Sequence, residues 1–256
     1  MNFLKSLPAR MKWSTTLALV CGLLSSGLLV SHAFSAQDPA ADPKTKSLPL
    51  GWDQAYFKII TTPDYPALEK GEILYKEKQV NSDTALAQTM GLINASPEAC
   101  YKAVKLYDNY TKTMPFTVES RVIRRYPLEG AVSAGAETVD FWTRVSVLGF
   151  ETRYLIRIAH LEEAAANRYR TFWTLVNNPA QVPCTDSEKR PCENDLAANI
   201  GSHLFEPYKG DPKRTLHTYT LKLVGKSWMQ RTALNVGGGS SMREVTERTR
   251  KAAEKK

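Results

Sequence analysis

Three histidines and one carboxylate are the side chains of this sequence best suited to acid–base chemistry. His160, His203 and His217 lie in the second half of the chain, and Glu206 precedes His217 in a segment that turns through "KGDPKR". In a hairpin around that turn, we expect Glu206 and His217 to lie nearly opposite each other, within reach of a cross-strand hydrogen bond. A charged surface pair fits this pattern as well as a base and its orienting carboxylate. Because no second acid or nucleophile stands at a suitable spacing, we predict no catalytic residue.

The sequence also gives no evidence for a catalytic serine or cysteine. The "GSS" at 239–241 lacks the G-x-S-x-G pattern of a nucleophile elbow, which argues against a serine hydrolase. Cys100 falls on the apolar side of a predicted helix, where a small buried hydrophobe is expected.

Cys184 and Cys192 flank a polar segment in "PCTDSEKRPC", each after a proline. In an oxidising compartment they predict a disulfide that pins a loop. A zinc pair and free thiols are the alternatives. Zinc would need two further ligands, and neither a second cysteine pair nor a nearby histidine pair supplies them, so we expect no metal.

The first 36 residues have the pattern of a secretory signal peptide. Three basic residues precede the uncharged apolar run Thr15–Val30, and "SHAFSA" offers small residues for cleavage. An uncleaved membrane anchor is the alternative, but it usually needs about 20 apolar residues. We therefore predict an exported protein, with a Gram-negative periplasm as the expected compartment. Residues 37–51 are rich in Pro, Asp and Lys and predict a flexible linker, and 52–71 predict an extension packed outside the domain.

The charge balance argues against a nucleic-acid partner. Removing the three basic residues of 1–36 from the 34 in the chain leaves 31 against 26 acidic ones, a net charge of +5. No basic run interleaved with aromatic residues marks a binding stripe. A net charge of +5 allows weak contact with an anionic membrane surface.

From Glu72 onward, alternating apolar and polar residues predict mostly β-strands. "TVDFWTRVSVL" puts Val139 and Phe141 on one face and Asp140 on the other, and "ETRYLIRIAH" alternates in the same way. This pattern is typical of an antiparallel sheet with one face in water, so the other face needs a cover. With 43% hydrophobic residues, the chain can build a sizeable core.

Helices are predicted at two places. Ser96, Pro97 and Glu98 form a helix start, and a second short helix spans about Leu106 to Thr113. A long helix is predicted from about Lys226 to the C-terminus. Gly237–Gly239 should break or kink it, with a linker between two helices as the alternative.

The order of these segments resembles the START-like superfamily, also called the helix-grip or polyketide cyclase-like fold. The resemblance covers about Glu72 to Ala253 and is carried by "INASPEACYKAV", "LYDNYTKTMPFTVESRVI", "GSHLFEP" and "TLHTY". It implies an α+β fold over 72–256, in which a curved antiparallel sheet wraps around a long C-terminal helix and two short helices lie between the first two strands.

The resemblance also implies an apolar cavity between sheet and helix, a hydrophobic small-molecule ligand such as a lipid, sterol or quinone, and no cofactor. By analogy, the inward-facing candidates are Val139, Phe141, Tyr154, Ile156, Trp173, Tyr219, Leu221, Met229 and Ala233. The alternatives are a small-molecule enzyme of the cyclase or hydratase type, with polar residues in the same cavity, and an interaction module with a filled core.

Overall fold

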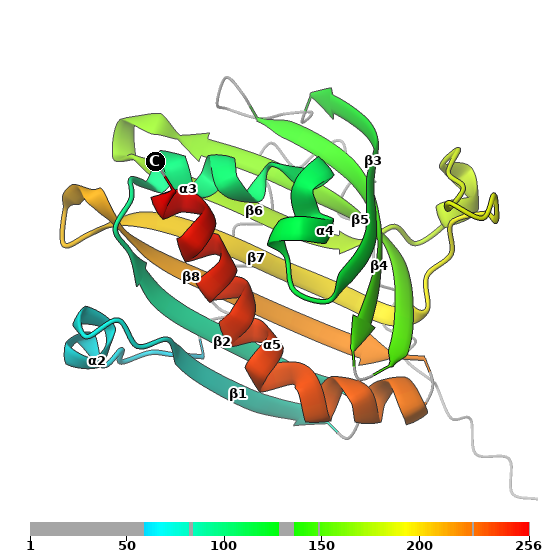
Figure 1. Cartoon of the computed structure of the whole chain (residues 1–256), viewed down its shortest axis with the longest axis horizontal. Helices are drawn as coiled ribbons and strands as arrows, with labels where there is room; N and C mark the ends of the chain where they lie inside the picture. Colours follow the sequence, from blue (N-terminus) through cyan, green and yellow to red (C-terminus); the bar gives the residue numbers. More distant parts are fainter. Residues whose placement is uncertain (1–58, 82–83, 128–135, 148, 227, 256) are drawn as a thin grey trace, which may run out of the picture. The chain divides into compact units, whose positions relative to one another are not determined.

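The computed structural model describes residues 59–81, 84–127, 136–147, 149–226 and 228–255 (Figure 1). For 228–238, only the backbone is described. The predicted signal peptide (1–36), the linker (37–51) and residues 52–58 of the predicted extension lie outside the described residues.

One antiparallel sheet dominates the fold. Its strands are β1 (Leu74–Asn81), β2 (Thr84–Ile93), β3 (Thr117–Pro127), β4 (Glu137–Val147), β5 (Phe150–Glu163), β6 (Arg168–Leu175), β7 (Leu196–Tyr208) and β8 (Asp211–Gly225). Their order in the sheet is β1-β2-β8-β7-β6-β5-β4-β3, so β3 to β8 form a meander of neighbouring strands. Only the link from β2 to β3 crosses from one side of the sheet to its far edge.

The helices lie mostly along that crossing and at the C-terminus. They are α2 (Tyr65–Glu69), α3 (Pro97–Val104), the 3-10 turn η1 (Tyr107–Asn109), α4 (Tyr110–Thr113), two further 3-10 turns, η2 (Ala164–Ala166) and η3 (Pro179–Gln181), and α5 (Trp228–Glu254). In Figure 1, α3, α4 and α5 lie on the same face of the sheet, which we call the inner face. The predicted α+β helix-grip architecture is confirmed, but the two short helices, predicted between the first two strands, lie between β2 and β3, because the β1–β2 hairpin precedes them.

The start of α3 follows the sequence prediction. Ser96 has extended backbone geometry, and its side chain accepts a hydrogen bond from the Ala99 N–H at 3.2 Å. Pro97 occupies the first helical position, where its missing N–H costs nothing. Cys100 is fully buried, and burial raises the pKa of its thiol to about 11. Both properties agree with a packing role for Cys100.

The helix α5 runs through Gly237–Gly239 without interruption, so the linker alternative is wrong. It changes direction within its first half (Figure 1). Farther along, the helix lies close to β2, because a Cβ atom added at Gly91 would meet the Thr246 methyl at 2.8 Å. The Thr89 and Thr246 hydroxyls are 2.7 Å apart, and Arg250 donates to the Leu92 carbonyl at 3.0 Å. The end of α5 is therefore fixed to the sheet by polar contacts.

The opposite face of the sheet, which we call the outer face, is less exposed than the sequence predicted. The segment after β6 covers Trp142 and Leu155, which form a buried cluster with Val176, Val182 and Cys192. Asp140, predicted to face water, is fully buried among arginines. The alternating pattern gave the correct face for Asp140, but it could not show that a distant loop covers that face.

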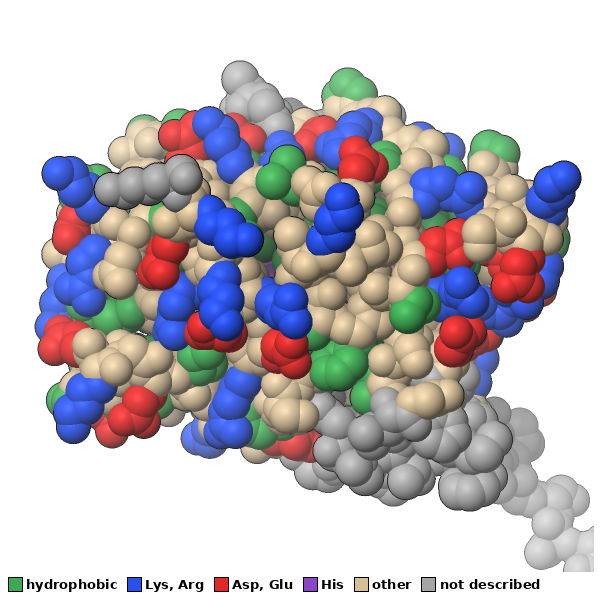
Figure 2. All heavy atoms as spheres, in the orientation of Figure 1, with side chains coloured by type: hydrophobic (Ala, Val, Ile, Leu, Met, Phe, Trp, Pro, Cys, Tyr) green, Lys and Arg blue, Asp and Glu red, His purple; other side chains and the backbone are tan. Residues whose placement is uncertain are grey.

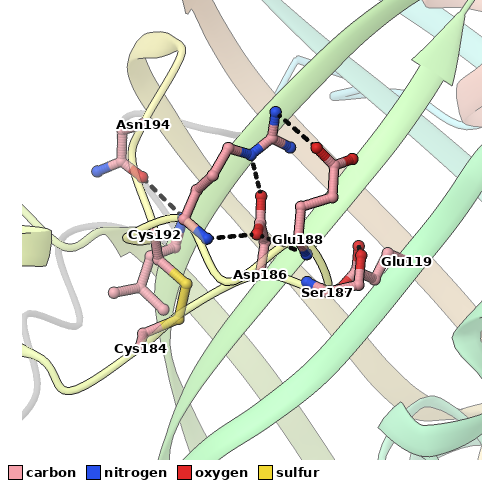
Figure 3. The surroundings of a disulfide bond; sticks show 9 residues. Glu119, Cys184, Asp186, Ser187, Glu188, Cys192 and Asn194 are labelled. Carbon is pink, nitrogen blue, oxygen red and sulfur yellow. Dashed lines mark hydrogen bonds and ion pairs between the residues drawn. A yellow bond between two sulfur atoms is a disulfide. The ribbon is translucent and has the colours of Figure 1, made fainter.

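The covering loop is closed by the disulfide between Cys184 and Cys192, which the structure forms as predicted (Figure 3). Inside the loop, the Asp186 carboxylate accepts hydrogen bonds from the Glu188 and Arg190 backbone N–H groups, both at 2.9 Å. Ser187 donates through its backbone N–H and its hydroxyl to the Glu119 carboxylate of β3, at 2.9 and 2.7 Å. These bonds tie the loop to the edge of the sheet.

A second stretch of the outer face is covered by residues 59–69. The Ile59 and Ile60 N–H groups donate to the Gln88 side-chain oxygen, at 3.2 and 2.8 Å. Leu68 of α2 is fully buried against Met90 and its neighbours. This part of the predicted extension therefore adds to the core beside β2 and β8.

Candidate functional site

The structure gathers most of the predicted cavity residues on the inner face. Val139, Phe141, Ile156, Trp173 and Tyr219 belong to one buried cluster, and Tyr154 and Leu221 pack against it. Met242 of α5 closes this cluster from the helix side. The side chains of Met229 and Ala233 lie outside the described residues. Whether any of these residues contacts a ligand stays a prediction.

Several inner-face side chains remain open to solvent although protein surrounds them. Burial raises the pKa of Tyr154 to about 12 and also raises the pKa of Tyr110, which shows that both phenols lie deep among protein atoms. Both residues nevertheless keep part of their surface accessible to solvent, as does Leu221 on the central strand β8. We predict that an internal space adjoins these side chains. Apolar and phenolic groups would face such a space together.

Strand register places a line of polar side chains across the same inner face. His160 of β5 pairs with Thr171 of β6, which pairs with His203 of β7. His203 in turn pairs with Tyr219 of β8, and Tyr219 with Thr89 of β2. Directly paired residues share a face of the sheet, so these five form one row, which we call the polar row. All five are buried.

The neighbouring row on the side of Tyr154 is apolar. Ile158 pairs with Trp173, Trp173 with Gly201, and Gly201 with Leu221. Gly201 has to be glycine, because an added Cβ would lie 2.2 Å from the Trp173 ring and 2.8 Å from the Thr220 carbonyl. The Trp173 indole N–H donates to the Asn199 side-chain oxygen at 2.9 Å, so the ring is held in place. The apolar row and the polar row are therefore adjacent on the inner face.

His160 forms a hydrogen-bonded couple with Tyr107 of η1. The Tyr107 hydroxyl and the His160 Nε2 are 2.6 Å apart. Both residues are almost fully buried, and Tyr107 also packs against Phe141 with ring centres 4.9 Å apart. Sequence reasoning missed Tyr107 as a polar partner, because the contact depends on how the crossing segment folds over the sheet. The second nitrogen of His160, Nδ1, has no hydrogen-bond partner among the described residues.

His203 and His217 form a second couple. The His203 Nδ1 and the His217 Nε2 are 2.9 Å apart, and the rings are stacked. His203 also stacks on Tyr219 at 4.7 Å between ring centres, and His217 on Phe205 at 4.8 Å. The His217 Nδ1 has no hydrogen-bond partner within the described part of the chain.

All three histidines are uncharged at neutral pH. Burial lowers the pKa of His203 to about 3, and burial also lowers the pKa values of His160 and His217 well below the ordinary range. The nearby positive charges of Lys105 and Arg125 add to the effect on His160. A buried histidine without a charged partner stays neutral, because the charged form would lose its hydration.

The predicted pairing of Glu206 with His217 is wrong. Strand β8 begins at Asp211, directly after the turn residues Lys209 and Gly210, and the register shifts between Pro207 and Tyr208. As a result His217 pairs with Phe205, and Glu206 pairs with Leu216. A difference of one residue in register moves a side chain to the other face of a sheet. Glu206 therefore lies on the outer face, 3.9 Å from Arg168, and does not orient His217.

The described residues contain neither a cluster of metal ligands nor a helix able to cross a membrane. No group of three or more His, Cys, Asp or Glu side chains is arranged there to hold a metal ion. In that same part of the chain, no helix combines the length and the apolar character needed to cross a membrane.

Comparison with known proteins places the fold but gives no relative by sequence. No protein-family model and no curated protein matches the chain. Among solved structures, a STAR-related lipid transfer protein fragment from Xanthomonas axonopodis is similar with a TM-score of 0.53 and 12% identity, covering 72% of this chain and 94% of that one. Human StAR-related lipid transfer protein 5 gives a TM-score of 0.52 at 11% identity, covering 70% of this chain and 86% of that one. Human STARD10 gives 0.50 at 12% identity, with 75% and 80% covered. The chain has the START-like fold.

Proposed function

We propose that this protein is exported and binds a hydrophobic small molecule, such as a lipid, a sterol or a quinone, between the inner face of its sheet and α5. It then carries or sequesters that molecule in an aqueous compartment. One observation carries the proposal: Tyr154 and Tyr110 lie deep among protein atoms and, like Leu221, keep part of their surface accessible to solvent, from which we infer an internal space beside them. The likeness in fold to proteins named for lipid transfer supports the same function.

Burial supplies the driving force. Removing apolar surface from water is worth about 25 cal/mol per Å2, so a ligand leaves a membrane only if the protein encloses most of it. The sheet provides an apolar wall for this purpose, with Ile158, Trp173 and Leu221 in one row. Phe141 and Ile156 extend the wall beyond that row.

The ligand has to pass the elements that cover the inner face. In Figure 1 these are α5 on the side of β1, β2 and β8, and α3 with α4 on the side of β3 to β6. The surface on this side of the molecule mixes basic and acidic side chains (Figure 2). Brief contact with an anionic membrane surface belongs to the proposal, since basic side chains are attracted to such a surface.

Export rests on the sequence of residues 1–36, and the disulfide suits an oxidising compartment. N-terminal sequencing of the protein recovered from the periplasm of an exporting host tests it. We expect an N-terminus at or near Gln37. Cytoplasmic protein that retains Met1 would contradict export and leave ligand binding unaffected.

Binding is tested by native mass spectrometry of Gln37–Lys256 from an exporting host, followed by extraction and identification of the bound molecule. We expect one apolar molecule per chain. The variant Leu221→Trp fills the internal space and should abolish uptake. Lys222→Trp is the matched control, since it adds the same ring on the other face of the same strand and should leave uptake unchanged. Normal stoichiometry in Leu221→Trp, or a wild-type protein that takes up nothing from a broad lipid panel, would contradict the proposal.

A further inference from the structure

The polar row lies between two apolar parts of the inner face, and some hydrogen-bonding groups at the row and next to it have no protein partner among the described residues. The His160 Nδ1 has no partner among the described residues, and neither does the Nδ1 of His217, which is bonded to the row through His203. The Tyr219 hydroxyl makes no hydrogen bond there either, although its ring is buried between His203 and Trp173. Two buried nitrogens, one on His160 and one on His217, thus lack a hydrogen-bond partner among the described residues.

The hydrogen bonds within the two couples determine whether each unpaired nitrogen is a donor or an acceptor. A neutral imidazole has one N–H and one bare nitrogen. If the Tyr107 hydroxyl donates to the His160 Nε2, then the His160 Nδ1 carries a hydrogen and needs an acceptor. In the His203–His217 hydrogen bond, one nitrogen carries the hydrogen and the other accepts it. If the His217 Nε2 accepts, the His217 Nδ1 is a donor, and if the His217 Nε2 donates, the His217 Nδ1 is an acceptor. His160 on β5 and His217 on β8 lie three strands apart, so one ligand oxygen reaches only one of them. A carbonyl oxygen can accept from a donor nitrogen, and a hydroxyl can also donate to a bare one.

The charges around the row favour an uncharged ligand group. Beside His160 the cations already have partners: Lys105 pairs with Glu137 at 2.6 Å, and Arg125 pairs with the same carboxylate. Arg250, whose charge acts on His217, pairs with Glu247 at 2.8 Å and keeps its Nη2 without a hydrogen-bond partner within the described residues. Beside His160, a buried carboxylate or phosphate would therefore meet only cations that are already paired, and burying a charge without its own counter-charge is strongly unfavourable. A neutral oxygen carries no such penalty.

We propose that the ligand is an apolar molecule with an uncharged hydroxyl or carbonyl group, whose hydrocarbon part lies on the apolar row and whose oxygen hydrogen-bonds to the polar row. This inference rests on the proposed function, and it adds the chemical class and the orientation of the ligand. An unpaired buried polar group is costly, so supplying its partner favours oxygenated ligands over hydrocarbons of the same shape.

The test is displacement of the neutral fluorescent probe N-phenyl-1-naphthylamine from the exported protein. Two series of competitors are delivered from cyclodextrin: octadecane, octadecan-1-ol and octadecanoate, and cholestane, cholesterol and cholesterol sulfate. Within the skeleton that fits, we expect the neutral alcohol to bind about tenfold more tightly than the hydrocarbon and than the anion.

Two variants assign that preference to the row. Tyr219→Phe removes one oxygen and keeps the ring, and His203→Phe keeps the stacking on Tyr219 while breaking the couple with His217. Both should bring the alcohol's affinity towards that of the hydrocarbon, with the hydrocarbon's own affinity unchanged. Ser202→Ala is the control, since Ser202 precedes His203 on the same strand and lies on the outer face.

The outcomes separate the two proposals. Equal affinity for alcohol and hydrocarbon, tightest binding of an anion, or a preference that survives in Tyr219→Phe and His203→Phe would overturn this inference and leave the proposed function intact. If neither the probe nor any competitor binds, the proposed function itself fails, and the inference fails with it.

Discussion

The two faces of the sheet each bury a polar cluster, and the clusters are built on opposite principles. On the outer face, the fully buried Asp140 carboxylate is bonded to Arg124 at 2.5 Å, to Arg157 at 2.9 Å and to the Tyr126 hydroxyl at 3.4 Å. On the inner face, the histidines are uncharged, and two of their nitrogens lack partners among the described residues. A satisfied ionic cluster holds the fold together, whereas an unsatisfied neutral one suits a partner from outside the chain.

The largest expected contrast between the faces is the response to pH. Above an ordinary histidine pKa of about 6.5, the three inner histidines are neutral in both the folded and the unfolded chain, so they make no difference to stability. Below that value the unfolded chain takes up protons that the folded chain refuses, because burial lowers the folded pKa values, to about 3 for His203. Stability should therefore fall as the pH falls, by about 1.4 kcal/mol per pH unit for each histidine.

Urea unfolding at pH 7 and pH 5 measures this loss. Between about 6.5 and 5, each histidine should remove about 2 kcal/mol of unfolding free energy, or about 6 kcal/mol for the three together. The variant His160→Leu should show a loss smaller by one histidine's share. Equal stability at the two pH values would show that the inner histidines are accessible to protons in the folded chain.

The sequence predicts those features of the two faces that depend on residues close together in the chain. Alternation along single strands predicts which face Val139, Phe141 and Asp140 occupy, and the start of α3 is encoded by Ser96 and Pro97 alone. The disulfide followed from two cysteines and an expected compartment. These features are local, so a few neighbouring residues determine them.

The polar row depends on residues that are far apart in the sequence. Each strand contributes a single member, so the row exists only once the register of five strands is known. The hairpin before His217 shows how sensitive that register is. Lys209 and Gly210 both have positive φ angles, and they form a tight turn inside the six residues that the sequence suggested as a loop. The resulting shift of one residue moved Glu206 to the outer face.

The second prediction tests the outer cluster. Asp140→Asn keeps the shape but removes the charge that neutralises Arg124 and Arg157, and it should lower the unfolding free energy by about 3 kcal/mol. Ligand stoichiometry should not change, because Asp140 lies on the outer face of the sheet. Glu244→Gln is the control, since its pair with Arg248 is exposed and should be worth less than about 0.5 kcal/mol. Similar small losses in both variants would mean that the outer cluster is not structural.

The third prediction concerns the loop that covers the outer face. Replacing Cys184 and Cys192 together by serine opens a short ring, with a sequence separation of 8, and should cost about 2 to 3 kcal/mol. A thermal melt with and without reductant measures the effect: the wild-type protein should lose stability in reductant and the double variant should not. Trp142 should become more exposed at the same time, which its fluorescence would report. An unchanged melting temperature would show that Ser187, through Glu119, holds the loop without the disulfide.

The smallest effect gives the sharpest comparison, because it changes one oxygen on each face. Tyr126 on the outer face donates to Asp140, so Tyr126→Phe should cost about 1 kcal/mol of unfolding free energy in the empty protein. Tyr219 on the inner face makes no hydrogen bond within the described residues, so Tyr219→Phe should cost about 0.5 kcal/mol or less. Ligand should reverse this order, since saturating ligand stabilises the protein according to its affinity, and only Tyr219→Phe weakens that affinity. If Tyr219→Phe is the more costly change without ligand, its hydroxyl is already satisfied in the empty protein, and the contrast between the two clusters fails at this residue.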